Sequence, residues 1–305
     1  MAKLSPQALQ EAQERTLARL RLVKSHFDDA PTAGRFKGKV AILTGVGSEK
    51  GIGRATARLL AREGAKHLYV LDYAAESLPA LKKELESEYS TLKVSTFDGD
   101  AADSPLIQSI CEQALTDNGR LDFFFANAGT VGSNMTLEGL DEEGVMEVLR
   151  VNTLSCFVAV KHASAAMKRN PPDLIGASIA LTASVAGIRS GAGPQDYSAS
   201  KAAVINLANT SAQALAGTGI RVNAICPGLI ETGMTTYTFE AAKARGTLGK
   251  VGQLNPLRRF GIAEEIAQAA LWLASDDSSY VNGIHLPVDG GLSSSHPVVP
   301  GREIV

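Results

Sequence analysis

The feature of this sequence that most constrains its fold is a regular alternation of short apolar runs with longer, helix-like segments. The apolar runs are residues 40–43, 68–71, 92–97, 121–126, 177–181, 220–225 and 284–288, and segments such as 54–63, 75–88 and 264–274 lie between them. This alternation predicts an α/β fold, a doubly wound parallel sheet of about seven strands with helices on both faces. Strands of such a sheet are buried on both sides, so their runs are continuously apolar.

We expect a single domain with an addition at each end. Residues 37–292 contain no internal repeat and no linker rich in Pro, Gly or Ser. Residues 1–36 are expected to form a helical extension, because Ser5-Pro6 is typical of a helix start. An apolar stripe follows, formed by Leu9, Ala12, Leu20, Val23 and Phe27. Residues 293–305 are assigned to a C-terminal tail.

Charge and cysteine content exclude several classes of protein. Lys and Arg number 30 and Asp and Glu 32, for a net charge of -2, whereas a nucleic-acid-binding protein needs a basic surface. Three cysteines without a CxxC pair and five histidines without ligand spacing predict neither a disulfide framework nor a metal site. No apolar run approaches the roughly 20 residues of a membrane helix. We therefore expect a cytoplasmic protein that binds no nucleic acid, membrane or metal.

A glycine-rich segment lies between the first apolar run and the first helical segment. It reads Thr-Gly-Val-Gly-Ser-Glu-Lys-Gly-Ile-Gly over residues 44–53. Glycines let the backbone turn tightly beside a pyrophosphate, and the following helix N-terminus offers free N–H groups and a positive dipole end. A Walker loop is excluded, because no Gly-Lys-Ser/Thr ends the segment. The position predicts a dinucleotide site that includes Gly45, Gly47, Ser48, Gly51 and Ile52.

Charged residues near this segment bear on the identity of the cofactor. Asp72, after the second run, can accept hydrogen bonds from both ribose hydroxyls of an adenosine and would repel a 2′-phosphate, which favours NAD over NADP. Alternatively, Asp72 caps the helical segment that begins near Ala74. Lys50 favours NADP, since an ammonium in the loop could serve a 2′-phosphate. Asp100, beside Ala101, could accept a hydrogen bond from the adenine amino group.

Ser184, Tyr197 and Lys201 form a candidate catalytic group. Tyr197 and Lys201 are at i and i+4, hence on one face of a helix. A free tyrosine has a pKa of about 10, and a nearby ammonium and an oxidised nicotinamide would lower that pKa into a range useful for general acid/base catalysis. Ser184 follows the fifth run and could hydrogen-bond the substrate oxygen. An isolated Tyr-x-x-x-Lys is commonly a solvated helix face, but here it accompanies the glycine-rich segment and Asp72.

With these residues in place, the chain resembles the short-chain dehydrogenase/reductase family over nearly all of residues 37–292. The resemblance rests on Thr44-Gly45…Gly51-Ile52-Gly53, Asn127-Ala128-Gly129, Asn152, Ser184, Tyr197…Lys201 and Pro227-Gly228-Leu229-Ile230-Glu231-Thr232. It implies a Rossmann fold, and it implies that Tyr197 moves the proton of the substrate oxygen. It further implies that Lys201 lowers the pKa of Tyr197 and binds the nicotinamide ribose, that Ser184 orients the substrate, and that Asn152 holds a water linking Lys201 to solvent. Cofactor contacts are implied for Asn127, Ala128, Gly129, Pro227, Gly228, Ile230 and Thr232.

The chain departs from the family pattern at two places. Five residues, 46–50, separate Thr-Gly from Gly-x-Gly where the family usually has three, so the loop is expected to bulge around Gly47, Ser48 and Lys50. Ala126 stands where the family usually has the first Asn of Asn-Asn-Ala-Gly.

Two nearly uncharged helical stretches predict a subunit interface. Residues 151–160 carry no charge, and residues 198–217 carry only Lys201. A helix that is apolar nearly all round must be covered, and the sheet covers only one face. We therefore expect a homodimer or homotetramer, as the family resemblance also implies. The alternative is a helix face rich in Ala and Ser that tolerates water.

Residues 233–260 follow the sixth run, where the family places a mobile substrate lid. Met234, Tyr237 and Phe239 could cover an apolar substrate. The same residues include five basic side chains and one acidic side chain, which could attract an anionic substrate or carrier. A solvated charged surface is the simpler alternative.

The sequence therefore predicts an NAD(P)-dependent oxidoreductase that interconverts a small-molecule secondary alcohol and a ketone, with Tyr197 as general acid/base. One alternative is an NADPH-dependent 3-oxoacyl reductase that acts on an acyl carrier thioester, favoured by Lys50 and the basic lid. The other is a cofactor-binding regulatory protein without turnover, which the presence of both Tyr197 and Lys201 disfavours.

Overall fold

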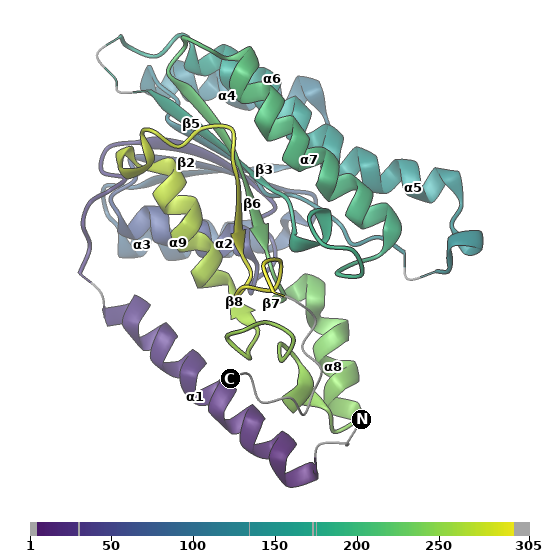
Figure 1. The fold of residues 1–305 in the computed structure, drawn as a ribbon. Helices are drawn as coiled ribbons and strands as arrows, with labels where there is room; N and C mark the ends of the chain where they lie inside the picture. Colours follow the sequence, from purple (N-terminus) through teal and green to yellow (C-terminus); the bar gives the residue numbers. More distant parts are fainter. Residues whose placement is uncertain (1–4, 30, 134, 173, 175, 296–305) are drawn as a thin grey trace.

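The computed structural model describes residues 5–29, 31–133, 135–172, 174 and 176–295. At its centre seven strands run parallel in one sheet, in the order β3-β2-β1-β4-β5-β6-β9 (Figure 1). The strands are β1 Val40–Thr44, β2 His67–Asp72, β3 Lys93–Asp98, β4 Phe123–Ala126, β5 Ala177–Thr182, β6 Ile220–Pro227 and β9 His285–Val288. Each predicted run forms one of these strands with ends that agree within two residues. The predicted fold class is confirmed.

Helices cover both faces of the sheet, because alternate residues of each strand point to opposite sides. In β1, Val40 and Ile42 belong to one apolar core, and Ala41 and Leu43 belong to the other. The first core is closed by α4 Ser104–Asn118, α6 Ser155–Met167 and α7 Gln195–Ala214. The second is closed by α2 Ile52–Arg62, α3 Leu78–Glu88 and α9 Ala263–Ala274.

The segment between β6 and α9 forms a separate layer beyond the carboxyl ends of the strands. A two-stranded parallel sheet pairs β7 Ile230–Glu231 with β8 Gly261–Ile262. Between these strands lies the 233–260 segment, with η5 Gly233–Thr235, α8 Thr236–Ala244 and η6 Leu248–Lys250. The other short elements are η1 Ala75–Ser77, η2 Leu137–Gly139, α5 Glu142–Leu149, the π-helical turn η3 Arg150–Leu154, η4 Val185–Gly187 and η7 Asp276–Ser278.

Ahead of the sheet, residues Pro6–Asp29 form the helix α1. Ser5 Oγ accepts a hydrogen bond from the Ala8 N–H at 3.1 Å, as expected at a helix start. In Figure 1, α1 runs along the lower edge of the molecule, away from the main sheet. Its apolar stripe packs on the 233–260 segment, where Leu20 is buried against Phe239 and Phe260.

Residues 296–305 of the expected C-terminal tail lie outside the described residues. Within the part of the chain that is described, no helix is both long and apolar enough to cross a bilayer.

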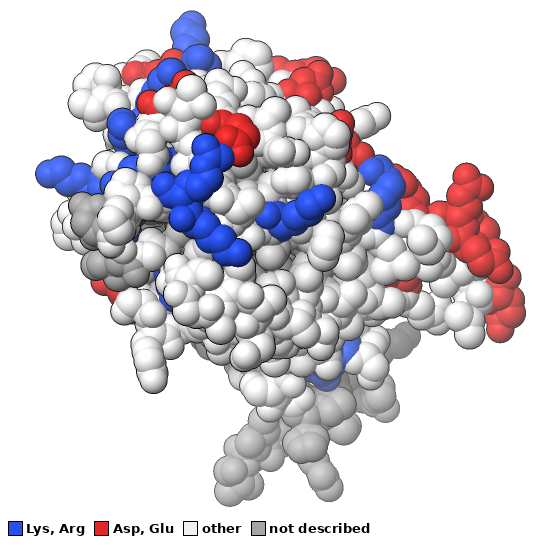
Figure 2. Space-filling model, turned by 90° about the horizontal axis from the view of Figure 1, so that it is seen from above, with Lys and Arg blue, Asp and Glu red and all other residues white. Residues whose placement is uncertain are grey.

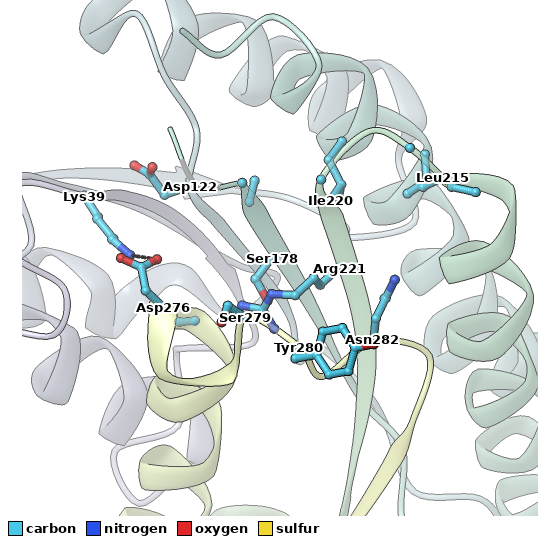
Figure 3. Close-up of a pocket in the computed structure, with 16 residues that line it drawn as sticks. Lys39, Asp122, Ser178, Leu215, Ile220, Arg221, Asp276, Ser279, Tyr280 and Asn282 are labelled. Atoms are coloured by element: carbon cyan, nitrogen blue, oxygen red, sulfur yellow. Dashed lines mark hydrogen bonds and ion pairs between the residues drawn. The ribbon is translucent and has the colours of Figure 1, made fainter. Parts of the chain in front are cut away.

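A hollow of about 350 Å³ opens at the amino ends of β5 and β6 (Figure 3). The Arg221 guanidinium and the Ser178 hydroxyl both donate to the Leu273 carbonyl oxygen, at 2.8 and 2.7 Å. Lys39 pairs with Asp276 at 2.8 Å across the rim. Polar side chains at this end of the sheet are therefore engaged with other parts of the protein.

Figure 2 shows the face that lies at the top of Figure 1, and it carries charges of both signs. Lys and Arg side chains gather across its middle. Asp and Glu side chains gather on the side where Figure 1 places α5, which begins with Glu142 and Glu143. Neither sign covers the whole face, in keeping with the nearly neutral composition.

Candidate functional site

A cleft of about 640 Å³ lies at the carboxyl ends of the strands, the end at which open parallel sheets bind ligands. The loops after β1, β2, β4, β5 and β6 line it. The predicted site residues that line this cleft are Gly45, Gly47, Ser48, Gly51, Ile52, Asp72, Asn127, Gly129, Ser184, Tyr197, Lys201, Pro227, Gly228, Ile230 and Thr232. The fold thus brings together motifs that are far apart in the sequence.

Close backbone contacts shape the glycine-rich segment. Gly45 has a φ of +72°, a left-handed conformation that glycine adopts without strain. A Cβ at Gly53 would collide with the Gly45 carbonyl oxygen, and a Cβ at Gly47 would lie 2.6 Å from the Ala74 carbonyl oxygen. Helix α2 begins at Ile52, which lines the cleft, so its unpaired N–H groups lie beside that space. This cradle fits a pyrophosphate.

Arg54 fastens the glycine-rich segment, a role that the sequence analysis missed. The residue is buried, and its Nε donates to the Val46 carbonyl oxygen at 3.2 Å. Its Nη2 donates to the Gly47 carbonyl oxygen at 3.3 Å and to Ser77 Oγ at 2.6 Å. Burial lowers the pKa of Arg54 below its ordinary value. Nothing local distinguishes this residue from a solvated helix arginine, because its partner Ser77 follows β2.

The Asp72 carboxylate is oriented by two backbone donors at the end of β2. Oδ2 accepts from the Gly47 N–H at 2.6 Å, and Oδ1 accepts from the Ala74 N–H at 2.8 Å. The second bond closes the turn before η1, so Asp72 serves that turn and lines the cleft at the same time. Each oxygen has a further lone pair for a ribose hydroxyl.

Lys50 does not line the cleft that Asp72 lines. Its side chain is exposed and lines the hollow between α1 and α2, beside Arg58 and Glu49, rather than the cleft. Lys50 belongs to the longer loop, residues 46–50, and does not line the cleft together with Asp72.

Asp100 and Ala101, expected near an adenine, also lie outside the lining of the cleft. Asp100 pairs with Arg150 at 2.5 Å and accepts from the Ala102 N–H at 2.8 Å. Burial alone would raise the pKa of Asp100, but the bond from Ala102 and the Arg150 guanidinium bring it below its ordinary value. Ala101 is buried in the core under α4 and α6. Arg150 is fifty residues away in sequence, so no local pattern indicates this pairing.

Asn127 locks the loop after β4 to the glycine-rich segment. Its Nδ2 donates to the Gly45 carbonyl oxygen at 3.0 Å, and its Oδ1 accepts from Thr182 Oγ1 at 3.1 Å. Thr44 Oγ1 accepts from the N–H groups of Asn127 and Ala128, both at 3.0 Å. Thr44 and Thr182 were not predicted as site residues, yet their hydroxyl groups hold Asn127 and the loop after β4 in place beside the cleft.

Tyr197, Lys201 and Ser184 meet in the cleft. Lys201 is only 3% exposed, and its Nζ donates to the Thr182 carbonyl oxygen at 2.8 Å and lies 5.6 Å from the centre of the Tyr197 ring. Tyr197 is half-buried in the first turn of α7. Ser184 follows β5, and its Oγ accepts from the Ala186 N–H at 3.1 Å. A phenol beside a fixed ammonium, with a hydroxyl in the same cleft, suits proton transfer to or from a substrate oxygen.

Asn152 is fully buried in the π-helical turn η3. Its Oδ1 accepts from the Thr130 N–H at 2.8 Å, and its Nδ2 donates to the Thr130 carbonyl oxygen and to Ser200 Oγ, both at 3.0 Å. A Cβ at Gly129 would lie 3.0 Å from Asn152 Oδ1 and 3.4 Å from Lys201 Nζ. Gly129 therefore lies close to both Asn152 and Lys201, and a side chain at this position would crowd them.

Asp196 is a further residue that the sequence analysis did not identify. It is buried, and its Oδ2 accepts from the Ser133 N–H at 2.8 Å while its Oδ1 accepts from the Tyr197 N–H at 2.8 Å. These bonds tie the loop after β4 to the end of α7 that carries Tyr197. A carboxylate in the first turn also suits the positive end of a helix dipole.

The three apolar residues expected to cover a substrate have different surroundings. Met234 lines the cleft, and Tyr237 is 78% exposed. Phe239 is buried against Leu20 and Phe260, outside the cleft lining, so the expectation that it covers a substrate is wrong. The sequence pattern did not reveal that α1 provides an apolar partner on the other side of α8.

The described residues contain no group of His, Cys, Asp and Glu that could hold a metal ion. Cys111, Cys156 and Cys226 are buried and free of disulfides.

Known proteins resemble this chain along most of its length. A family profile described as Enoyl-(Acyl carrier protein) reductase matches residues 45–293. The 3-oxoacyl-(acyl-carrier-protein) reductase of Thermotoga maritima is 40% identical over 261 residues, which cover 85% of this chain and 99% of that protein. Levodione reductase of Leifsonia aquatica is 34% identical over 270 residues, covering 88% of this chain and 98% of that protein.

The fold is equally similar to solved structures. A crystal structure of levodione reductase matches with a TM-score of 0.77 at 33% identity, covering 86% of this chain and 100% of that chain. Every residue that lines the cleft falls within the region matched by the family profile, whereas α1 precedes that region.

Proposed function

Since this chain belongs to the short-chain dehydrogenase/reductase family, and so is an NAD(P)-dependent oxidoreductase that interconverts a secondary alcohol and a ketone, we propose that Tyr197 is its general acid/base. In the reductive direction Tyr197 gives its phenolic proton to the carbonyl oxygen, and in the oxidative direction it takes the proton of the alcohol. The nicotinamide, when bound, accepts or donates the hydride.

The observation that carries this proposal is the buried ammonium beside the phenol. Lys201 is fixed by the Thr182 carbonyl oxygen and lies next to the Tyr197 ring, so its charge offsets the negative charge on Tyr197 while the proton is on the substrate. Ser184 donates its hydroxyl hydrogen to the same substrate oxygen and orients it. Asn152, joined to Thr130 next to Gly129, keeps the wall behind Lys201 in place.

We propose that the preferred cofactor is NAD. Asp72 lines the cleft with an oriented carboxylate, which accepts from ribose hydroxyls and repels a 2′-phosphate. Lys50, the residue that favoured NADP, lines a different hollow. The N-terminus of α2 and the glycines before it would hold the pyrophosphate.

A second candidate is an NADPH-dependent 3-oxoacyl reductase that acts on an acyl carrier thioester. It is supported by the name of the relative that is 40% identical. The basic lid supports it less than the sequence suggested, because Arg259 pairs with Glu265 at 2.6 Å. Val131 and Met234 are apolar members of the cleft lining, which favours an uncharged ketone. A cofactor-binding protein without turnover is disfavoured, because Ser184, Tyr197 and Lys201 converge in one cleft.

We also propose that two copies associate through α5, α6 and α7. A groove of about 980 Å³ on these helices is lined by apolar side chains that include Met146, Leu154, Phe157 and Leu207. Met146, Leu154 and Phe157 are 62%, 43% and 53% exposed, and such a contiguous exposed apolar patch is typical of an interface between proteins. Light scattering at micromolar concentration should give the mass of a dimer or a tetramer, and a monomer mass would overturn this assignment.

A reducing, cytoplasmic location fits the three cysteines, which are all free in the structure.

The reaction is tested with a panel of secondary alcohols and ketones, levodione included, read at the nicotinamide absorbance band with both cofactors. We expect turnover of an uncharged ketone and, by fluorescence titration, a lower Kd for NAD than for NADP. Tyr197→Phe should keep the Kd for NAD and lose about 10³-fold in kcat. Unchanged turnover in this variant would contradict the role of Tyr197, and turnover confined to acyl carrier thioesters would favour the second candidate.

A further inference from the structure

We propose that α1 is a strut that holds the 233–260 segment at the substrate end of the cleft, with Leu20 as the positioning residue. The family profile begins at residue 45, so α1 is not part of the matched region. The kinetic part of this inference rests on the proposed function, whereas the structural part does not.

The apolar stripe of α1 contributes to a small core that is separate from the two cores of the sheet. Leu20 packs with Phe239 of α8 and with Phe260, and all three are buried. The two phenylalanine rings meet edge to face, with centres 4.8 Å apart and planes at 84°. Leu20 is the only member of this buried trio that the 233–260 segment does not supply itself.

Two further contacts fix the position of α1 along the segment. Gly249 in η6 lies against the Leu9 carbonyl oxygen so closely that a Cβ at Gly249 would collide with it. Arg19 Nη1 donates to the Leu257 carbonyl oxygen at 3.2 Å. The helix therefore touches the segment near its beginning, its middle and its end.

The other end of α1 is attached to the body of the protein. Arg62, in the last turn of α2, donates to the carbonyl oxygens of Phe27 and Asp28, the latter at 3.0 Å. The last carbonyl groups of a helix have no partner within the helix, so these bonds cap α1. Because α2 packs on the main sheet, α1 joins a rigid element to the 233–260 segment.

A displacement of α8 would move residues of the cleft lining, because these residues directly precede the helix. Helix α8 begins at Thr236, directly after η5, and Met234 and Thr235 line the cleft. Thr235 Oγ1 donates to the Ile230 carbonyl oxygen at 2.6 Å and accepts from the Thr232 N–H at 3.0 Å. If Phe239 loses its packing, the wall at Met234 loses its support, while Tyr197 and Lys201 stay on α7.

Leu20→Ala tests the strut, and Leu22→Ala is the matched control, since Leu22 lies on the same helix but is 72% exposed. Backbone amide exchange of the full-length chain, followed by mass spectrometry, should become about tenfold faster at residues 236–251 in Leu20→Ala. Exchange in β1, β2 and α7 should stay as in the unaltered protein. Leu20→Met keeps the apolar volume and should restore slow exchange.

The kinetic readout uses levodione as the probe ketone. In Leu20→Ala, its KM should rise about tenfold with kcat and the Kd for NAD unchanged, because the variant leaves the reacting groups in place. Faster exchange throughout the domain, or equal effects of Leu20→Ala and Leu22→Ala, would overturn the strut. If exchange responds locally but no ketone is reduced even by the unaltered protein, the strut stands and the proposed function fails.

Discussion

The two ends of strand β5 carry the same side chain in two different situations. Ser178, near the amino end, donates to the Leu273 carbonyl oxygen at 2.7 Å and is buried. Ser184, just past the carboxyl end, is nearly as buried, but its hydroxyl faces the cleft with Tyr197. The two serines differ in where the donated hydrogen can go, not in residue type or depth.

The same contrast holds for the whole sheet. At the amino ends, Arg221 and Ser178, which line the hollow there, are engaged with backbone carbonyl groups. At the carboxyl ends, the loops leave the α2 N-terminus, Ser184 and Tyr197 beside open space. A hollow becomes a reactive site when its polar groups remain available to a ligand, and a parallel sheet provides this at its carboxyl edge.

Replacing each serine by alanine should give the largest difference between the two ends. Ser184→Ala removes the hydroxyl that we propose orients the substrate oxygen, so kcat/KM should fall by about 10²–10³-fold. Ser178→Ala should leave kcat/KM unchanged. Steady-state assays with the best ketone of the panel measure both, and equal losses in the two variants would contradict the division of roles.

Arg221→Leu should affect stability rather than turnover. The variant removes donors to the carbonyl oxygens of Leu273, Ser275 and Val281, so the free energy of unfolding should fall by about 2 kcal/mol. Urea denaturation measures this change, and kcat per folded molecule should stay constant. A loss of kcat without a loss of stability would place part of the site at the amino end.

At the carboxyl end of β2, Asp72→Ser tests the proposed contact between the Asp72 carboxylate and the adenosine ribose of the cofactor. Loss of the carboxylate should raise the Kd for NAD about tenfold and reduce the preference for NAD over NADP, because the repulsion of a 2′-phosphate disappears. Asp98→Ser is the control, since Asp98 pairs with Asp72 in the sheet register but is exposed and lies outside the cleft lining. Fluorescence titration should show no change in the control, and equal effects would remove the argument for NAD.

Replacement of His67, at the amino end of β2, should give the smallest effect, a change in the free energy of unfolding that is visible only at acid pH. Burial lowers the pKa of His67 to about 4, and its ring nitrogens are engaged by Ser95 Oγ and Asn118 Nδ2. The unfolded chain therefore binds a proton at a pH where the folded protein does not. This stabilising contribution is complete above about pH 6.5 and is lost as the pH falls towards 4.

Replacement by an uncharged side chain should remove that dependence. In His67→Gln, the free energy of unfolding should decline less between pH 6.5 and 4 than in the unaltered protein, as measured by urea denaturation at several pH values. His285→Gln, at an exposed position of β9, is the control. The same decline in all three proteins would show that another group causes the acid sensitivity.

Strand positions and the main motifs could be predicted because they depend on local pattern. Apolar runs mark buried strands, glycines mark tight turns, and the i, i+4 spacing of Tyr197 and Lys201 puts both on one helix face. The parallel topology then brings the carboxyl ends of the strands together. This explains why Asp72 and Ser184, which were both predicted as site residues, line the same cleft.

Contacts between distant segments could not be predicted in this way. Arg54 donates a hydrogen bond to Ser77, and Asp100 pairs with Arg150, and both contacts form only when the chain has folded. Phe239 is a large apolar residue in the expected lid, so the sequence suggested that it covers the substrate. Its contact with Leu20 of α1, which buries it outside the cleft, is seen only in the folded protein. Each of these cases depends on a partner that the neighbouring sequence does not indicate.

Helix α1 precedes β1 and is linked to it by residues 30–39, so its presence changes no crossover connection of the sheet. The order and direction of the seven strands therefore do not depend on this helix. Its partners, Gly249 and Phe239, also lie outside the sheet. If α1 holds the 233–260 segment as proposed, a change in their contact alters the substrate end of the cleft without any change in the strands.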